Sequence, residues 1–343
     1  MLRVITMAFG VTLTFAGLLW APVAGAQTLV PASGWFSSPS GFSTRYGQIS
    51  LTCPEASRCD DTTTCSTTVA FPAPAGIGSG QIEAVLTGFD IRTSGGPVVP
   101  MAALGAGVSG TFDPATGNVV VDVWAQATDD GLPGGPFYDV DVSFFVIAGG
   151  PGATYGGGPV SATCSSASPS CSTTVAGSPM GAGVAATGQL QSFCVESMAS
   201  VSPDAVALWT TTDPVSGAVT VDATLSGAPS APINAYATVL SGFVAVPQTP
   251  LSHADFGVSG ETILPETPAP ASAPWVALEG FDLRYVGGAT RDTWRTTSGW
   301  VAPSLVGGVF DIDYGAFLAD DPGNPFANIV PYDYALGGRL YHP

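Results

Sequence analysis

Hydrophobic residues recur at every second position along many short stretches of this chain. In residues 118–127, Val119, Val121 and Val123 fall on one face of an extended strand. Gly, Pro and β-branched residues interrupt almost every window long enough for an amphipathic helix. The pattern predicts an all-β protein with strands at 81–91, 118–127, 137–147, 189–199, 218–225, 236–246, 275–285 and 309–318.

Turn residues separate these stretches. Asp113-Pro-Ala-Thr-Gly117 and Asp213-Pro-Val-Ser-Gly217 each combine a Pro, whose φ is preset, with a Gly that can take positive φ. Such segments join neighbouring strands as hairpins. Short strands at regular intervals, without helices between them, predict tandem antiparallel β-sandwich repeats with short loops.

The chain also repeats its own sequence. Ser50-Leu-Thr-Cys53 and Cys65-Ser-Thr-Thr-Val-Ala70 return as Ser161-Ala-Thr-Cys164 and Cys171-Ser-Thr-Thr-Val-Ala176. These two copies lie about one small domain apart.

A third copy is marked by Gly280-Phe-Asp-Leu-Arg284, which matches Gly88-Phe-Asp-Ile-Arg92. The second copy has Cys194-Val-Glu-Ser-Met198 in that place, so a site shared by the first and third copies is expected to be missing from it. We therefore divide the chain into a leader and three β-sandwich repeats, at 1–26, 27–150, 151–249 and 250–343.

Two segments near the divisions allow more than one interpretation. The Gly-rich residues 156–159 read as part of a flexible linker after the first repeat. Residues 265–274 are either a stiff Pro-rich spacer or, as we prefer, an edge strand and loop inside the third repeat.

Residues 1–26 have the layout of a signal peptide. Arg3 precedes an apolar run from Met7 to Trp20, and Ala24-Gly25-Ala26 forms a small-residue cleavage motif. A membrane anchor is the weaker alternative because the apolar run is short and interrupted by Gly and Pro. We expect a protein that is secreted to the extracellular space or cell surface and does not insert in a membrane after cleavage.

Charge narrows the range of partners. The formal net charge is −18, and the chain contains no Lys. Such an acidic surface repels nucleic acid and anionic lipid. Although only 10% of residues are charged, hydrophobic residues make up 45% of the chain, which is enough for packed cores.

The six cysteines fit an oxidising compartment. Aligning the two openings predicts one local disulfide in each of the first two repeats, Cys53 with Cys65 and Cys164 with Cys171. The partners of Cys59 and Cys194 stay open, and pairing of Cys59 with Cys65 is an alternative. The cysteine spacings do not supply the close pairs of a zinc site.

The order of elements resembles the H-type lectin domain, a six-stranded antiparallel sandwich that commonly assembles through its sheets. In the first repeat the matching features are a strand before Pro72, a strand ending in Leu86-Thr-Gly-Phe-Asp-Ile91, a strand carrying Trp124, and a final strand at 139–147. The resemblance implies binding of galactose-type sugars. No sugar site transfers residue by residue, because Trp124 is followed by Ala and Gln with no His nearby.

Catalytic motifs are not found. His253 and His342 lie in no known motif, and no Gly-x-Ser-x-Gly or His-Glu-x-x-His sequence occurs. We therefore expect a protein that is not an enzyme. A hydrolase that uses pairs of carboxylates is kept as a further alternative, since Asp residues alone can support glycoside hydrolysis.

Acidic loops are the candidate metal site. Carboxylates clustered in a Gly-containing loop provide the oxygen ligands that Ca²⁺ needs, although Asp, Gly, Pro and Asn also favour ordinary solvated turns. Ca²⁺ is the single candidate cofactor. The candidate ligands are Asp129, Asp130, Asp320, Asp321 and Asn324.

Aromatic and Arg side chains are the candidate ligand-binding set. Their rings and guanidinium groups can contact a glycan or a neighbouring subunit, or simply pack in the core. The candidates are Trp124, Tyr285, Arg291, Trp294, Arg295 and Trp300.

Together these observations predict a secreted, non-catalytic surface, matrix or appendage protein. It would act by self-assembly or adhesion, as a homo-oligomer or with other extracellular proteins, because repeats multiply weak contacts and exposed sheet edges can pair with another chain. The alternative is a lectin-like module that binds glycans.

Overall fold

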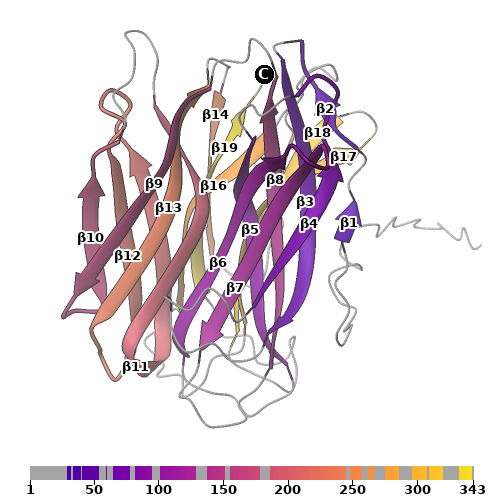
Figure 1. Ribbon diagram of the computed structural model, residues 1–343. Helices are drawn as coiled ribbons and strands as arrows, with labels where there is room; N and C mark the ends of the chain where they lie inside the picture. The colour runs from indigo at the N-terminus through magenta and orange to yellow at the C-terminus, as the bar shows by residue number, and fades with distance from the viewer. Residues whose placement is uncertain are drawn as a thin grey trace, which may run out of the picture.

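The computed structural model describes residues 29–31, 34–39, 41–53, 59, 65–77, 82–94, 101–128, 137–150, 155–177, 186–244, 248–256, 262–265, 275–285, 296–306, 309–319 and 332–341. These residues form strands, bridged by turns and bends, and none of them is helical. The predicted all-β class is confirmed (Figure 1).

The described strands pair antiparallel throughout. They are β1 (Leu29–Pro31), β2 (Phe36–Ser37), β3 (Phe42–Cys53), β4 (Ser66–Pro72), β5 (Ile82–Ser94), β6 (Met101–Asp113), β7 (Asn118–Thr128), β8 (Phe137–Gly149), β9 (Tyr155–Ser166), β10 (Ser170–Val175), β11 (Thr187–Thr212), β12 (Val219–Ala228), β13 (Ile233–Val244), β14 (Gln248–Phe256), β15 (Thr262–Pro265), β16 (Trp275–Tyr285), β17 (Thr296–Val306), β18 (Val309–Ala319) and β19 (Tyr332–Tyr341).

The strands form two sheets. The eight-stranded sheet has the order β1-β3-β8-β5-β17-β18-β15, and β2 also pairs with β3. The eleven-stranded sheet divides into two wings at the long strand β11. The first half of β11 pairs with β6 and β13, whereas its second half pairs with β12 and β16. The first wing is therefore β4-β7-β6-β11-β13-β9, and the second is β10-β12-β11-β16-β19-β14.

One pairing pattern occurs three times along the chain. We call the three segments β3–β8, β9–β13 and β14–β19 units. In the first unit, β3, β8 and β5 (its first, last and third strands) lie side by side in that order, and β6, β7 and β4 (its fourth, fifth and second strands) do the same. The same order holds for β9–β13, where the two halves of β11 serve as third and fourth strands, and for β14–β19. The third strand of each unit then pairs with the fourth strand of another, through β5–β17, β11–β6 and β16–β11. Each sheet or wing thus continues across the divisions predicted near residues 150 and 250.

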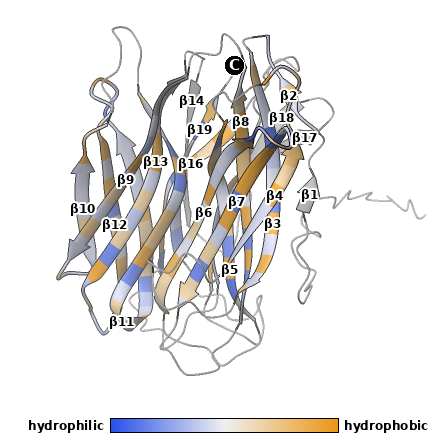
Figure 2. Cartoon of the chain, viewed as in Figure 1, coloured by the Kyte–Doolittle hydropathy of each residue, from blue (hydrophilic) through white to orange (hydrophobic). Residues whose placement is uncertain are grey.

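The core is shared in the same way. Phe89, Phe193 and Phe281 occupy matching places on the third strands, and their ring centroids lie 4.8 to 5.1 Å apart. Residues of all three units belong to one buried hydrophobic cluster. On β7, Val119, Val121 and Val123 are buried as their alternation predicts, and Figure 2 shows hydrophobic and hydrophilic positions interspersed along the same strands.

Element boundaries differ from the prediction where pairing decides them. The stretch predicted at 189–199 is part of β11, which continues for 26 residues because each half has its own pair of neighbours. Residues 156–159, expected in a linker, belong to β9 and pair with β13. Thr262–Pro265 forms β15 at the edge of the eight-stranded sheet. Of the segment 265–274, for which we preferred an edge strand and loop, residues 266–274 lie outside the described residues.

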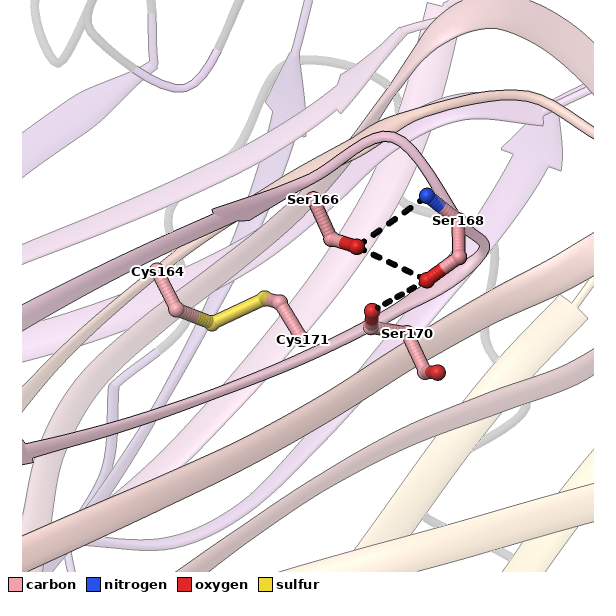
Figure 3. The surroundings of a disulfide bond; sticks show 5 residues. All are labelled: Cys164, Ser166, Ser168, Ser170 and Cys171. Carbon is pink, nitrogen blue, oxygen red and sulfur yellow. Dashed lines mark hydrogen bonds between the residues drawn. A yellow bond between two sulfur atoms is a disulfide. The ribbon is translucent and has the colours of Figure 1, made fainter.

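The disulfides confirm the predicted local pairs. Cys53 is bonded to Cys65, and Cys164 to Cys171. The second bond spans the β9–β10 turn, where Ser168 also hydrogen-bonds Ser166 and the carbonyl of Ser170 (Figure 3). The alternative pairing of Cys59 with Cys65 does not form.

Cys59 is instead bonded to Cys194, which links the first unit to the second. All six cysteines are therefore paired. This pairing indicates an oxidising environment.

Candidate functional site: three seams between the units

Among the described strands, three pairs join two different units, and we call these pairs seams. Seam 1 is β5–β17, seam 2 is β6 with the first half of β11, and seam 3 is β16 with the second half of β11. A β-bulge precedes the matching residue of each third strand. The residues that face each other there are Gly88 and Trp300, Ser192 and Gly107, and Gly280 and Trp209.

The repeated Gly-Phe-Asp-Ile/Leu-Arg motif lies on the third strand of seams 1 and 3. Because side chains alternate along a strand, its Phe enters the core while its Gly, Asp and Arg share the outer face. The Gly makes room for the neighbouring unit. A Cβ atom at Gly280 would overlap the ring of Trp209, and one at Gly88 would lie 2.6 Å from the Cβ of Trp300. The motif thus sets Asp and Arg beside a Trp from another unit.

Seam 1 carries a network of two carboxylates and one guanidinium. Arg92 contacts Asp141 at 2.6 Å and Asp90 at 3.3 Å, and Ser50 donates a hydrogen bond to Asp141. Burial raises the pKa of Asp90 to about 7; Arg92 opposes this rise and Asp141 adds to it. Burial also raises the pKa of Asp141. The side chains of Asp90 and Arg92 nevertheless keep 23% and 25% of their surface exposed.

Seam 3 has a more open version of the same set. Arg284 donates two hydrogen bonds of 2.6 Å to the carboxylate of Asp282, and 58% of the Arg284 side chain is exposed. These bonds raise the pKa of Arg284. The ring of Trp209 lies over Gly280 and Gly337, where any Cβ atom would overlap it.

Seam 2 keeps the Trp but changes its neighbours. Trp124 lies over Gly107. It is on β7, the fifth strand of its unit, whereas Trp209 and Trp300 are on the fourth strands of theirs. The register places Cys194 where the other seams have Asp, and Glu196 where they have Arg. Cys59 is bonded to Cys194, so this seam holds a disulfide in place of an ion pair.

The residues predicted to bind ligand are separated in the structure. Trp124 belongs to seam 2 and Trp300 to seam 1, while Tyr285 lies next to Arg284 on β16. Tyr285 packs against the core, so the aromatic cluster expected in the third repeat is not assembled from Tyr285 and Trp300. Arg291, Trp294 and Arg295 lie outside the described residues.

Sequence reasoning missed most of the residues that the seams bring together. Asp90, Arg92, Asp282 and Arg284 were visible as the repeated motif, which aligned the repeats and suggested a site shared by the first and third copies, but these four residues were not selected as candidates. Trp209 carried no such signal, because its partner glycine lies 71 positions away in the chain.

The structure does not describe the candidate Ca²⁺ ligands. Asp129, Asp130, Asp320, Asp321 and Asn324 lie outside the described residues, as does His342. His253 is on β14. In the described part of the chain, no group of three or more His, Cys, Asp or Glu is arranged to hold a metal ion.

Comparison with known proteins adds no family. A scan against protein-family models finds no match, and a search of curated proteins also finds none. Over the residues that can be described, no helix has the length and apolarity to cross a bilayer.

Proposed function

We propose that this protein is an exported, non-catalytic adhesion protein that binds glycans at seams 1 and 3. One observation carries the proposal. The same set of Trp, Asp and Arg recurs on the outer face of two seams, each built from a different pair of units. Close packing of the units requires the Gly and the Phe of the motif, whereas its Asp and Arg lie on the outer face and do not fill the hydrophobic core.

The chemistry of the set suits a sugar. The apolar face of a sugar ring stacks on an aromatic ring, while carboxylate and guanidinium groups bond to its hydroxyls. At seam 1, Oδ1 of Asp90 is buried and has no hydrogen-bond partner among the described residues. At seam 3, the exposed Arg284 still presents donors after pairing with Asp282. A hydroxyl-rich ligand could bond to these donors at seam 3 and to the exposed part of the Asp90 side chain at seam 1.

Charge favours neutral glycans. The chain has a formal net charge of −18, and both Arg side chains are already paired with carboxylates. An acidic sugar would therefore meet repulsion at each seam. The resemblance to H-type lectin domains supports the same class of ligand, and two sites on one chain would strengthen binding to a surface through avidity.

A glycan array followed by titration tests this proposal. The mature protein is expected to bind neutral glycans, with two sites per chain. We expect Trp300→Ala and Trp209→Ala each to weaken one site, and the double variant to lower apparent affinity at least about tenfold, since stacking is lost at both sites and avidity falls with it. Trp35→Ala, in the segment between β1 and β2, is the matched control. A double variant that binds as the wild type does would refute glycan binding at these seams.

Self-assembly through sheet edges is a second candidate, favoured by a difference between edge strands. The edge of β3 is covered by β1 and β2, whereas β9 and β14 end their wings in the described part of the chain. Free edges can pair with a second copy. Light scattering and electron microscopy over a concentration series, with and without Ca²⁺, would reveal such assembly; a monomer at every concentration would exclude it.

A further inference from the structure

Seam 2 has a Trp-bearing outer face like those of seams 1 and 3, but Cys59 of the first unit lies on it. Trp124 shares the outer face with Glu196 and with Gln126, two residues further along the same strand. Cys59 comes from the first unit and is held on this face by its disulfide to Cys194. Both cysteines are buried, and Trp124 packs against them together with Tyr236.

Cys59 contacts the seam in the way a ligand would. Its backbone N–H donates a 3.0 Å hydrogen bond to Oε2 of Glu196, whose other oxygen accepts one of 2.8 Å from Asn234. The carboxylate at this seam is thus bonded by a group from another unit. At seams 1 and 3 the carboxylates, Asp90 and Asp282, lie two residues earlier in the register, pair with Arg on their own strands and remain partly exposed.

The side-chain amide of Gln126 lacks hydrogen-bond partners in this arrangement. Its side chain is 1% exposed, yet neither its amide nitrogen nor its amide oxygen has a hydrogen-bond partner in the described part of the chain. It pairs across the ladder with Gly105, and a Cβ atom there would lie 2.8 Å from Sγ of Cys194. A buried amide without partners is unfavourable, and a ligand that both donates and accepts hydrogen bonds, as a hydroxyl does, would complete it.

We propose that seam 2 is a third carbohydrate-binding surface, for the same class of neutral, hydroxyl-rich ligand, and that the Cys59–Cys194 disulfide keeps it occupied. This inference rests on the proposed function of seams 1 and 3. A dithiol would release the surface by exchange: the disulfide takes up two electrons and two protons to give two thiols, while the dithiol becomes a disulfide. The number of binding sites would then rise from two to three.

Two full-length variants test the inference. Cys59→Ser/Cys194→Ser removes the bond, and Cys59→Ala/Cys194→Asp also restores the carboxylate found at the other seams; the second serves if the first fails to fold. Cys164→Ser/Cys171→Ser, which removes the β9–β10 disulfide, is the matched control. Titration with a neutral glycan selected on the array should give three sites for either variant and two for the control. Adding Trp124→Ala should return three sites to two.

Hydrogen exchange of β6 and β7 separates the possible failures, because it requires no glycan. Faster exchange with a third site supports the inference. Faster exchange with only two binding sites would show that the surface becomes exposed but does not bind sugar. Unchanged exchange with two binding sites would show that the disulfide does not control the surface. Either result overturns the inference and leaves the proposal for seams 1 and 3 intact. Binding by neither wild type nor variant overturns both proposals. Binding by the variant alone supports seam 2 and removes seams 1 and 3.

Discussion

Seams 1 and 3 carry the same five-residue motif but differ in the strand beside it. At seam 1, Asp90 faces Asp141 across the ladder, and Arg92 lies between two carboxylates. At seam 3, Asp282 faces Ala335, and Arg284 is free to form a two-pronged bond with one carboxylate. The motif therefore orients the side chains, while the cross-strand neighbour determines their burial and charge.

The three units are similar on the inner face of the sheets and differ from one another on the outer face. On the inner face, Phe89, Phe193 and Phe281 form one cluster with similar spacing at all three contacts. On the outer face, the three seams hold a partly buried charge network, an exposed ion pair and a disulfide. Packing density constrains the inner face, because small changes of volume are felt in a core. The outer face can diverge.

The largest expected effect tests the equivalence of the inner positions. Phe89→Ala, Phe193→Ala and Phe281→Ala should each lower the free energy of unfolding by about 3–5 kcal/mol, because each leaves a cavity in the same cluster. Urea denaturation measures the loss. Phe112→Ala, at a partly buried position outside the three-ring cluster, should cost less. A near-neutral result at one of the three would show that the units do not share the core equally.

The second prediction is that the stability of the fold depends on pH through seam 1 but not in the same way through seam 3. The pKa of Asp90 is raised to about 7 from an ordinary value of 3.8, so the folded state binds this proton more tightly than the unfolded state does. The resulting stabilisation is complete below about pH 4 and is lost as pH rises through about 7; it amounts to at most about 4 kcal/mol. Arg92 and Asp141 act on Asp90 directly, and Asp139 acts on Asp141.

Thermal melts between acidic and mildly alkaline pH measure this effect. Asp90→Asn should flatten the profile, with the variant gaining on the wild type as pH rises. Asp282→Asn is the matched change at seam 3 and should leave the contribution of Asp90 in place. If Asp90→Asn leaves the pH dependence of the melting temperature unchanged, Asp90 at seam 1 is not the group responsible for it.

The smallest effect compares the two arginines. Arg92→Gln should cost about 1–3 kcal/mol at neutral pH, because two partly buried carboxylates lose their cation. Arg284→Gln should cost less than about 1 kcal/mol, since an exposed ion pair contributes little. Chemical denaturation at low and moderate salt checks both values. Equal losses would mean that the neighbouring strand does not control the strength of the pair.

Much of the fold follows from local patterns. Alternation placed Val119, Val121 and Val123 in the core, and the Asp-Pro-x-x-Gly segments mark turns in which Gly117 and Gly217 take positive φ. Aligning the repeats predicted two of the three disulfides. The partners of Cys59 and Cys194 stayed open because no local pattern marks a bond between different units across 135 positions.

The candidate site was only half visible for the same reason. The Gly-Phe-Asp-Ile/Leu-Arg motif stood out as a repeat, but nothing local indicates that its Gly accommodates a Trp of another unit. Trp300 was selected for its closeness in sequence to Tyr285, and the two strands instead belong to different sheets. Proximity along the chain was misleading because both ends of a unit pair with other units.

The sequence by itself determined the all-β class, the alternation that divides inner from outer faces, and the turns and local disulfides, because each depends on residues a few positions apart. Only the tertiary structure decided which units share a sheet, that one strand of 26 residues serves two wings, and which Trp meets which Gly. Those pairings depend on the closure of three units around one core, where the contacts that select a partner lie up to about two hundred residues apart.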